Sequence, residues 1–432
     1  MKTTHVAARF VDGKLVVDVA GVEDPQPVCY RTNAMLPLSR LARSPHLLEV
    51  FELLLVLYTA DRLVPRPLRR WSRRFDVSFP VSRIAQWKAA QADIEQLIWQ
   101  CTGDEVSLRP YERPANCHHC DARSNWFELE YPRATSVLLL SDGLDSLCGA
   151  IDAALLPGGQ LAFVSLISNS RKAPRIAAVI RHLKATHGDR IAHHPVWLHL
   201  EEAPRKQERT QRTRTMLAIT AGLTVAAAYG AATAAVSENG MGILNLPIPA
   251  LQTRHESSQV LHPANLPLWA RISERLIGGA AVTYPNRYRT KAQMLQSLPE
   301  GARYLIKVTS SCDAPQRSDE YPDCGVCGSC IVRKVALRAA GLSFYDTTYT
   351  RRPPKPGLYD PIDLLTYQAG RMKQALESGS PWAALVRLQP TLRFAIEAIE
   401  PADRQQSVAA TIDLLRRHLT EAEDVRVLAR AV

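Results

Sequence analysis

The sequence lacks the features of an exported or repetitive protein. Its first nine residues, Met-Lys-Thr-Thr-His-Val-Ala-Ala-Arg, contain no uninterrupted apolar stretch, so we expect no secretory segment. No internal repeat or low-complexity tract is present. The nine cysteines include four in one metal-binding pattern, which suits a reducing cytoplasm better than a disulfide framework. We therefore expect a cytoplasmic protein.

The composition is that of an ordinary globular protein. Of the 432 residues, 46% are hydrophobic and 22% are charged, which requires no long disordered region. This length favours two or three domains over a single core. The formal net charge of +11 indicates anionic partners. A nucleoside triphosphate, nucleic acid and an acidic protein would all satisfy that charge, so it does not decide whether the protein binds nucleic acid directly.

A charge-free segment from Leu217 to Val236 is about as long as a membrane-spanning helix. It is dominated by Ala, Gly and Thr, and Gly230 divides it into a helix and a short strand, Ala231 to Val236. A buried helix followed by the fourth strand of a parallel sheet therefore explains this segment better than a membrane span does.

A phosphate-binding turn is the most informative motif. An apolar run ending at Leu140 breaks into Ser-Asp-Gly-Leu-Asp-Ser, residues 141–146, and a second apolar segment follows. The strand would place Ser141, Gly143 and Ser146 at a helix N-terminus, where free N–H groups and the helix dipole favour an anion. The same residue types are common in any strand-to-helix turn, so the motif alone leaves both interpretations open.

Four cysteines further along the chain have the spacing of a metal site. Cys312 is followed by Cys324, Cys327 and Cys330, with glycine after Cys324 and after Cys327. A Cys-x-x-Cys turn lets both sulfurs reach one metal ion, and the glycines supply the backbone freedom that such turns need. The pattern predicts a closed, structural Cys₄ zinc site rather than buried cysteines without a ligand.

Two motifs together resemble a known family. Residues 141–146, Ser-x-Gly-x-Asp-Ser, resemble the pyrophosphate loop (PP-loop) of ATP pyrophosphatases, which adenylate a carbonyl or carboxyl oxygen. With the cysteine knuckle downstream, the layout resembles that of the 7-cyano-7-deazaguanine synthases, the QueC family. Two further segments also resemble those of the family. One is Arg214-Thr215-Met216-Leu217, and the other is Tyr284-Pro285 followed by Thr290-Lys291-Ala292. The resemblance covers about residues 135–345.

The chain departs from the family pattern at three places. Asp142 stands where most members have glycine, so its side chain must point away from the phosphates or toward Mg²⁺. Ser237-Glu238-Asn239-Gly240 replaces the family's Gly-x-Asn-x-x-Asp substrate loop. More than a hundred residues precede the PP-loop, and this extended form resembles the QueC-like component of bacterial Qat anti-phage systems.

The loop chemistry and the resemblance together imply the residue roles. Ser141, Gly143 and Ser146 would hold the departing phosphates, Asp145 would bind Mg²⁺, and Lys291 would add a cation. The wider nucleotide site would comprise Ser141, Asp142, Gly143, Leu144, Asp145, Ser146 and Arg214.

The resemblance also implies the reaction, that of an ATP-dependent C–N ligase. The carboxylate of 7-carboxy-7-deazaguanine, or of a related deazapurine, would attack the α-phosphate of ATP, and an amine would then displace AMP. By resemblance the amine is ammonia, and a second activation dehydrates the amide to the nitrile. We nevertheless expect that the acceptor here is an amine on a partner protein of the same defence operon. An enzyme acting on two small molecules needs no additional N-terminal domain.

The order of predicted elements favours a doubly wound parallel α/β sheet in residues 135–310. By resemblance this is the PP-loop fold of the adenine nucleotide alpha hydrolase, or HUP-like, class, with the zinc knuckle in residues 311–345. Ligands of such sheets bind beyond the carboxyl ends of the strands, where the strand order reverses. Strands are predicted at Val137–Leu140, Leu161–Ile167, Val196–Leu200, Ala231–Val236, Ala281–Tyr284 and Tyr304–Val308.

Two flanking regions differ from this pattern. Residues 1–134 predict an α+β domain that docks a partner, and residues 346–432 predict a helical region with three amphipathic helices. The N-terminal elements are a hairpin around Asp12-Gly13, helices at Leu53–Leu63 and Ile84–Cys101, and a strand at Glu105–Arg109. Cys117-His118-His119-Cys120 contains only one Cys-x-x-Cys pair, so a loop is expected there rather than a second metal site.

Three functional interpretations follow from the sequence. The favoured one is the deazapurine ligase, either in a defence system or as an ordinary 7-cyano-7-deazaguanine synthase of queuosine biosynthesis. A tRNA-modifying thiolase would use the same adenylation loop, but it needs a sulfur-transferring cysteine or an iron–sulfur cluster. The third interpretation is a non-catalytic partner protein that has kept the fold. Its only support in the sequence is Asp142, which stands where most family members have glycine.

Overall fold

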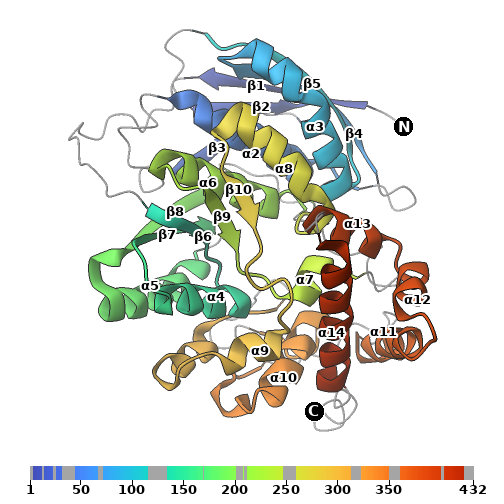
Figure 1. Cartoon of the computed structure of the whole chain (residues 1–432). Helices are drawn as coiled ribbons and strands as arrows, with labels where there is room; N and C mark the ends of the chain where they lie inside the picture. Colours follow the sequence, from blue (N-terminus) through green and yellow to red (C-terminus); the bar gives the residue numbers. More distant parts are fainter. Residues whose placement is uncertain are drawn as a thin grey trace.

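A ten-stranded sheet runs through the protein (Figure 1). The structure, a computed structural model, describes residues 3–11, 14–22, 26–31, 44–66, 72–114, 134–168, 170–200, 208, 212–246, 259–312, 323–349, 361–399 and 403–422. The strands are β1 (Thr3–Val11), β2 (Lys14–Val19), β3 (Gln26–Arg31), β4 (Arg74–Val81), β5 (Glu105–Glu112), β6 (Ala134–Leu139), β7 (Gln160–Ile167), β8 (Ile191–Leu200), β9 (Thr233–Val236) and β10 (Ala281–Thr283). They lie in the order β10-β9-β6-β7-β8-β3-β2-β1-β4-β5.

The strands β6 to β10 form a parallel, doubly wound unit. Every pairing among them is parallel, and their order across the sheet is β8-β7-β6-β9-β10. The chain therefore starts in the middle at β6, builds outward to one side through β8, and then crosses to the other side of β6. This arrangement confirms the predicted α/β class with a parallel sheet.

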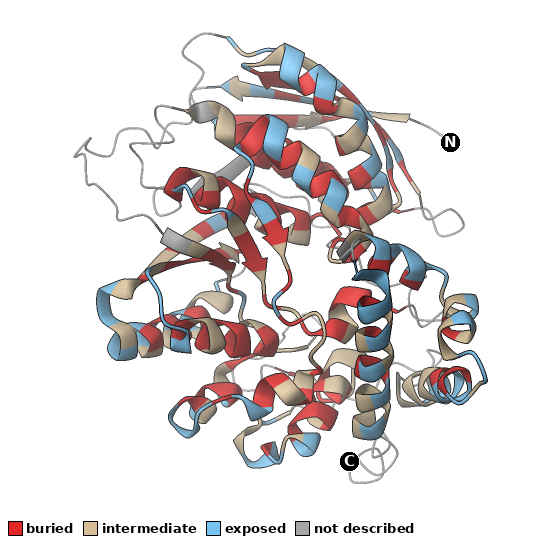
Figure 2. Cartoon of the chain, in the orientation of Figure 1, coloured by how far each residue is buried: buried red, intermediate tan, exposed pale blue. Residues whose placement is uncertain are grey.

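Helices cover both faces of this unit, which explains why its strands are apolar on both sides. Leu138 of β6 and Phe163 of β7 pack with α4 (Leu144–Leu155) and α5 (Lys172–His187). Val137 and Val164, which face the other way, pack with α6 (Arg214–Tyr229). Figure 2 shows the buried residues gathered in the sheet and in the helices that cover it.

The charge-free segment is a buried helix and a strand, as predicted. α6 is followed by Gly230 in the left-handed conformation (φ +69°) and then by β9. Across the described part of the chain, no helix combines the length and the apolar character that crossing a membrane requires.

One predicted strand is wrong. Residues Tyr304–Val308 belong to a 3₁₀ helix, η6 (Glu300–Val308), rather than to a sixth strand of the parallel unit. The buried side chains are Ala302, Leu305 and Ile306, which are three or four positions apart, whereas Tyr304 is 48% exposed. That spacing matches a helical turn and not the alternation of a strand.

The N-terminal strands continue the same sheet. β3 pairs antiparallel with β8, and β1 and β2 form the predicted hairpin. The predicted helices and strand are observed as α2 (Glu49–Leu63), α3 (Ile84–Thr102) and β5. Buried residues of this half share one apolar cluster with α6, so the two halves of the sheet have a common core.

The C-terminal region is helical, but the prediction of three helices is wrong. Residues 361–422 contain α11 (Pro361–Leu376), α12 (Pro381–Leu388), α13 (Thr391–Ile399) and α14 (Arg404–Ala422). Pro390 separates α12 from α13 because proline cannot continue the helical hydrogen bonding. The remaining helices are α7 (Gly240–Leu244), α8 (Leu266–Ile272), α9 (Lys291–Gln296) and α10 (Gly328–Ala339), the 3₁₀ helices η1 (Pro45–Leu48), η3 (Gly188–Arg190), η4 (Pro263–Asn265) and η7 (Ser343–Tyr345), and the π-helical turn η5 (Ser273–Ile277).

Candidate active site and metal centre

The candidate active site lies where the order of the parallel strands reverses. Residues 141–146 follow β6, and Ser237 to Asn239 follow the neighbouring strand β9. The chain leaves these two strands for opposite sides of the sheet, and in sheets of this class a crevice is expected beyond the carboxyl ends of such strands. Sheets of this class bind their ligands in that crevice, so the topology places the predicted phosphate loop where a ligand is expected.

The loop forms the start of helix α4. Gly143 is the N-cap residue, with extended backbone angles (φ −83°, ψ 158°), and the helix begins at Leu144. The hydroxyl oxygens of Ser141 and Ser146 lie 2.8 Å apart, and the Gly143 N–H donates to Ser141 Oγ at 3.1 Å. The Leu144 side chain is buried in the core, so only its backbone is available to a ligand. The two hydroxyls and the first N–H groups of α4 form a cradle suited to phosphate.

Asp145 is the centre of a polar cluster. Its Oδ2 atom accepts hydrogen bonds from Lys291 Nζ at 2.7 Å and from Asn239 Nδ2 at 3.0 Å. The amide of Asn239 also donates to Glu238 Oε1 at 2.8 Å. The other carboxylate oxygen of Asp145, Oδ1, is buried and has no hydrogen-bond partner within the described residues. A buried carboxylate oxygen without a partner is a suitable ligand for Mg²⁺.

The protonation states of this cluster follow from its charges. Burial alone would raise the pKa of Asp145, but the Lys291 charge and the hydrogen bonds from Lys291 and Asn239 lower it below its ordinary value. Burial and the nearby Asp145 charge raise the pKa of Glu238 well above its ordinary value. Asp145 is therefore ionised and Glu238 holds the proton of the pair. The pKa of Lys291 is raised: burial acts to lower it, and the Asp145 charge outweighs that effect.

Asp142 points toward helix α5. Its carboxylate lies 3.1 Å from Arg175 Nη1 and 3.6 Å from Lys172 Nζ. Burial and the neighbouring charge of Arg214, at the start of α6, lower the pKa of Lys172. Three cations thus gather at the N-termini of two helices, and Asp142 supplies a negative charge there. Cations at helix N-termini are unfavourable without an anion, so this group is suited to a phosphate ligand.

The sequence pointed to the loop of Glu238 and Asn239 as an altered substrate loop but gave neither side chain a role in the site. It gave no indication of Lys172 and Arg175. Asn239 has two functions, because its Oδ1 accepts the N–H groups of Met241 and Gly242 at the start of α7 while its Nδ2 reaches Asp145. Both Glu238 and Asn239 lie directly after a buried strand, at the carboxyl end where site residues gather, as the predicted strand order indicated.

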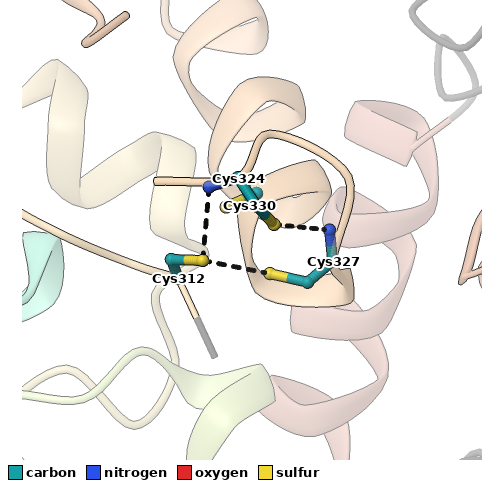
Figure 3. A group of neighbouring side chains, drawn as sticks. All are labelled: Cys312, Cys324, Cys327 and Cys330. Atoms are coloured by element: carbon teal, nitrogen blue, oxygen red, sulfur yellow. Dashed lines mark hydrogen bonds between the residues drawn. The ribbon is translucent and has the colours of Figure 1, made fainter. Parts of the chain in front are cut away.

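The four cysteines predicted to bind zinc lie together (Figure 3). All sulfur atoms of Cys312, Cys324, Cys327 and Cys330 are within 4.8 Å of one another. Four sulfurs about 2.3 Å from a tetrahedral zinc ion would be roughly 3.8 Å apart, so a small inward shift completes the site. Backbone N–H groups of Cys324 and Cys327 donate to Cys312 Sγ at 3.3 Å and Cys324 Sγ at 3.4 Å, which stabilises thiolates.

The knuckle is fixed to the sheet unit by buried polar contacts. Asp323 accepts from Ser310 Oγ at 2.6 Å, and the Ser310 N–H donates to the Asp142 carbonyl at 2.9 Å. Arg333 of α10 is fully buried and donates to Ile306 and Thr309. The Cys₄ group is therefore connected to the loop of residues 141–146 through one short segment, although none of its side chains belongs to the Asp145 cluster.

Comparison with known proteins gives no further assignment: no family model matches the chain, and neither curated proteins nor solved structures include a match. The predicted loop Cys117-His118-His119-Cys120 lies outside the described residues. Among those residues, the Cys₄ group is the one cluster with metal-ligand spacing.

Proposed function

We propose that this protein is an ATP-dependent ligase that adenylates a carboxylate and transfers the acyl group to an amine. The observation that carries the proposal is Asp145, an ionised, buried carboxylate at the start of α4, with one oxygen bound by Lys291 and the other without a partner among the described residues. This is what a site needs to hold a metal-bound triphosphate beside a helix N-terminus.

Each group of side chains in the site would have a separate role in this reaction. Ser141, Ser146 and the first N–H groups of α4 would bind the departing β- and γ-phosphates, and Lys291 would stabilise the charge that develops on them. Mg²⁺ held by Asp145 would neutralise charge on the same oxygens. The substrate carboxylate would attack the α-phosphorus from the opposite side, and an amine would then displace AMP from the acyl group.

The Cys₄ centre supports a structural role for zinc in this proposal. Four thiolates complete a tetrahedral zinc ion, so no position stays open for substrate or water. The resemblance of the PP-loop and this knuckle to the QueC family gives the substrate class: 7-carboxy-7-deazaguanine or a related deazapurine carboxylate. More than a hundred residues precede the PP-loop, and because of this extension we propose that the protein is the QueC-like component of a bacterial Qat anti-phage system.

The acceptor amine distinguishes the ordinary synthase, which uses ammonia, from a ligase that modifies a partner protein. With ammonia, the primary amide can lose water to give the nitrile of an ordinary synthase. With an amine of a partner protein the product is a secondary amide, which cannot become a nitrile, so the reaction ends as a stable adduct. We propose the partner protein, because the substrate loop of the family is altered here at Ser237 to Gly240.

The cysteines that the structure describes do not favour a thiolase. Outside the Cys₄ group, the cysteine side chains described are Cys101 and Cys148, and both are buried. Burial raises the pKa of both thiols above their ordinary range, which leaves them unreactive toward sulfur transfer.

The test is an incubation of the purified protein with ATP, Mg²⁺ and 7-carboxy-7-deazaguanine, with ammonia or with proteins encoded beside it. The proposal predicts release of pyrophosphate and AMP and, with the correct neighbour, a mass increase of that protein. Nitrile formation with ammonia, with no mass change on any neighbouring protein, would exclude the protein acceptor and support an ordinary 7-cyano-7-deazaguanine synthase. Absence of nucleotide cleavage under all conditions would refute the ligase.

A further inference from the structure

Helix α14, at the C-terminal end, packs against α7 (Figure 1) and hydrogen-bonds to residues at the start of α9. These are the two segments that deliver side chains to Asp145. The first segment is the start of α7, one residue after Asn239. A Cβ atom at Gly240 would clash with the backbone carbonyl oxygen of Arg287 and would meet Leu414 Cδ2 of α14 at 2.5 Å. Leu414 is fully buried in an apolar cluster with Leu244 of α7. The Asn239 loop is therefore tightly packed between the backbone at Arg287 and the Leu414 side chain of α14.

The second segment is the start of α9, where Lys291 is the first residue. Thr290 and Gln293 form a capping box: Thr290 Oγ1 accepts the Gln293 N–H at 3.1 Å, and Gln293 Oε1 accepts the Thr290 N–H at 3.0 Å. Each of these two side chains also contacts α14. The Thr290 hydroxyl donates to Glu421, and Arg417 donates to Gln293 Oε1.

A third contact completes this connection. Arg417 Nη2 donates to the carbonyl of Tyr288 at 3.1 Å, just before the capping box. Arg417 and Glu421 lie four positions apart, on one face of α14, so one helix face holds the whole N-terminus of α9. Neither side chain bonds to Asp145 or Lys291 in the contacts that the structure gives them.

We infer that Glu421 and Arg417 are positioning residues that set the place of the Lys291 ammonium relative to Asp145. The catalytic consequence rests on the proposed function, whereas the positioning itself does not. Both residues lie outside the segment that resembles the QueC family, so the C-terminal helices of this chain supply part of the support for its site. A displacement of about 1 Å at a reacting group can cost up to 100-fold in rate, so small losses of support become measurable.

The experiment compares four full-length variants with the wild type. Arg417→Met and Glu421→Leu remove the two contacts. Glu421→Gln keeps an oxygen that accepts from Thr290, and Arg416→Met alters an exposed neighbour on the same helix. One readout is the rate at which acetic anhydride acetylates Lys291, followed by peptide mass spectrometry. The other is kcat and KM for ATP in pyrophosphate release.

We expect Arg417→Met and Glu421→Leu to raise the acetylation rate of Lys291 several-fold and to lower kcat by about 10-fold. KM for ATP should change by less than about twofold, because the phosphate cradle is elsewhere. Glu421→Gln and Arg416→Met should match the wild type. If both disruptive variants match Arg416→Met in acetylation and kcat, the inference is overturned.

The two readouts separate this inference from the proposed function. Faster acetylation of Lys291 in a protein whose wild type releases no pyrophosphate would support the positioning and refute the ligase. If Arg417→Met does not fold, the pair Glu421→Leu and Glu421→Gln gives the same comparison. Equal acetylation rates in that pair would then overturn the inference.

Discussion

The ammonium nitrogen of Lys291 lies 2.7 Å from Oδ2 of Asp145, although 146 positions separate the two residues in the chain. Asn239 donates to the same oxygen at 3.0 Å. The Oδ2 atom of Asp145 therefore accepts two hydrogen bonds, and the charge of Lys291 keeps the Asp145 carboxylate ionised. The second oxygen is left for a ligand that the protein does not itself supply in its described residues.

Replacing Asp145 or Ser146 by alanine should abolish pyrophosphate release. Asp145→Ala removes the proposed metal ligand, and Ser146→Ala removes a hydroxyl of the phosphate cradle. Loss of one such electrostatic contact costs about 10²–10³ in kcat. The control is Asp189→Ala, at an exposed position on η3. Activity of either site variant within tenfold of this control would argue against the assigned roles.

Asp142→Gly should be tolerated, and it should tighten ATP binding. The carboxylate neutralises Lys172 and Arg175, and its removal leaves their charge for the triphosphate. Asp142→Asn is the matched variant, because it removes the charge and keeps the shape. Calorimetric titration with a non-hydrolysable ATP analogue measures the affinity. A loss of turnover as large as that of Asp145→Ala would instead show that Asp142 coordinates the metal.

Cys327→Ser should lower both the zinc content and the melting temperature. Structural zinc sites contribute on the order of 10 kcal/mol in small domains, and the loss of one thiolate opens the tetrahedral site. Elemental analysis and thermal unfolding provide the measurement. Cys101→Ala serves as the control, because Cys101 lies in the apolar core and is not a member of the Cys₄ group. Full zinc stoichiometry in Cys327→Ser would show that this residue is not a ligand.

The Glu238–Asp145 pair predicts a pH dependence of stability. The pKa of Glu238 in the folded protein is raised above its ordinary value of 4.5, so its contribution is complete below pH 4.5 and is lost as the pH rises through the raised pKa. Glu238→Gln mimics the protonated form. Its melting temperature should therefore increase relative to the wild type as the pH rises from about 5 to 9. A constant difference across this range would mean that Glu238 does not hold the proton.

Local spacing was sufficient to predict much of this protein. The Cys₄ pattern predicted a cluster because a Cys-x-x-Cys turn has few geometries, and the apolar run before Ser141 predicted β6 and the start of α4. Other features depend on partners that are distant in sequence. The antiparallel pairing of β3 with β8, which joins the two halves of the sheet, has no local signal.

The missed and mistaken elements have the same physical cause. In Tyr304–Val308 the apolar residues fit a strand locally, but packing of Leu305 and Ile306 against α4 and α5 selects a 3₁₀ helix. The roles of Asn239 and Lys172 depend on which strand ends are neighbours, which the sheet order decides. Support of Lys291 from Glu421, 130 positions after it, depends on how the C-terminal helices pack.

The proposed ligase requires the Asp145 site to cleave ATP between the α- and β-phosphates when a deazapurine carboxylate is present. The most direct measurement is the nucleotide product formed by wild type and by Asp145→Ala with ATP, Mg²⁺ and 7-carboxy-7-deazaguanine, resolved by ³¹P NMR. We expect AMP and pyrophosphate in equal amounts from the wild type, only when the carboxylate is present, and neither product from the variant. Formation of ADP and phosphate, or products equal in both proteins, would contradict it.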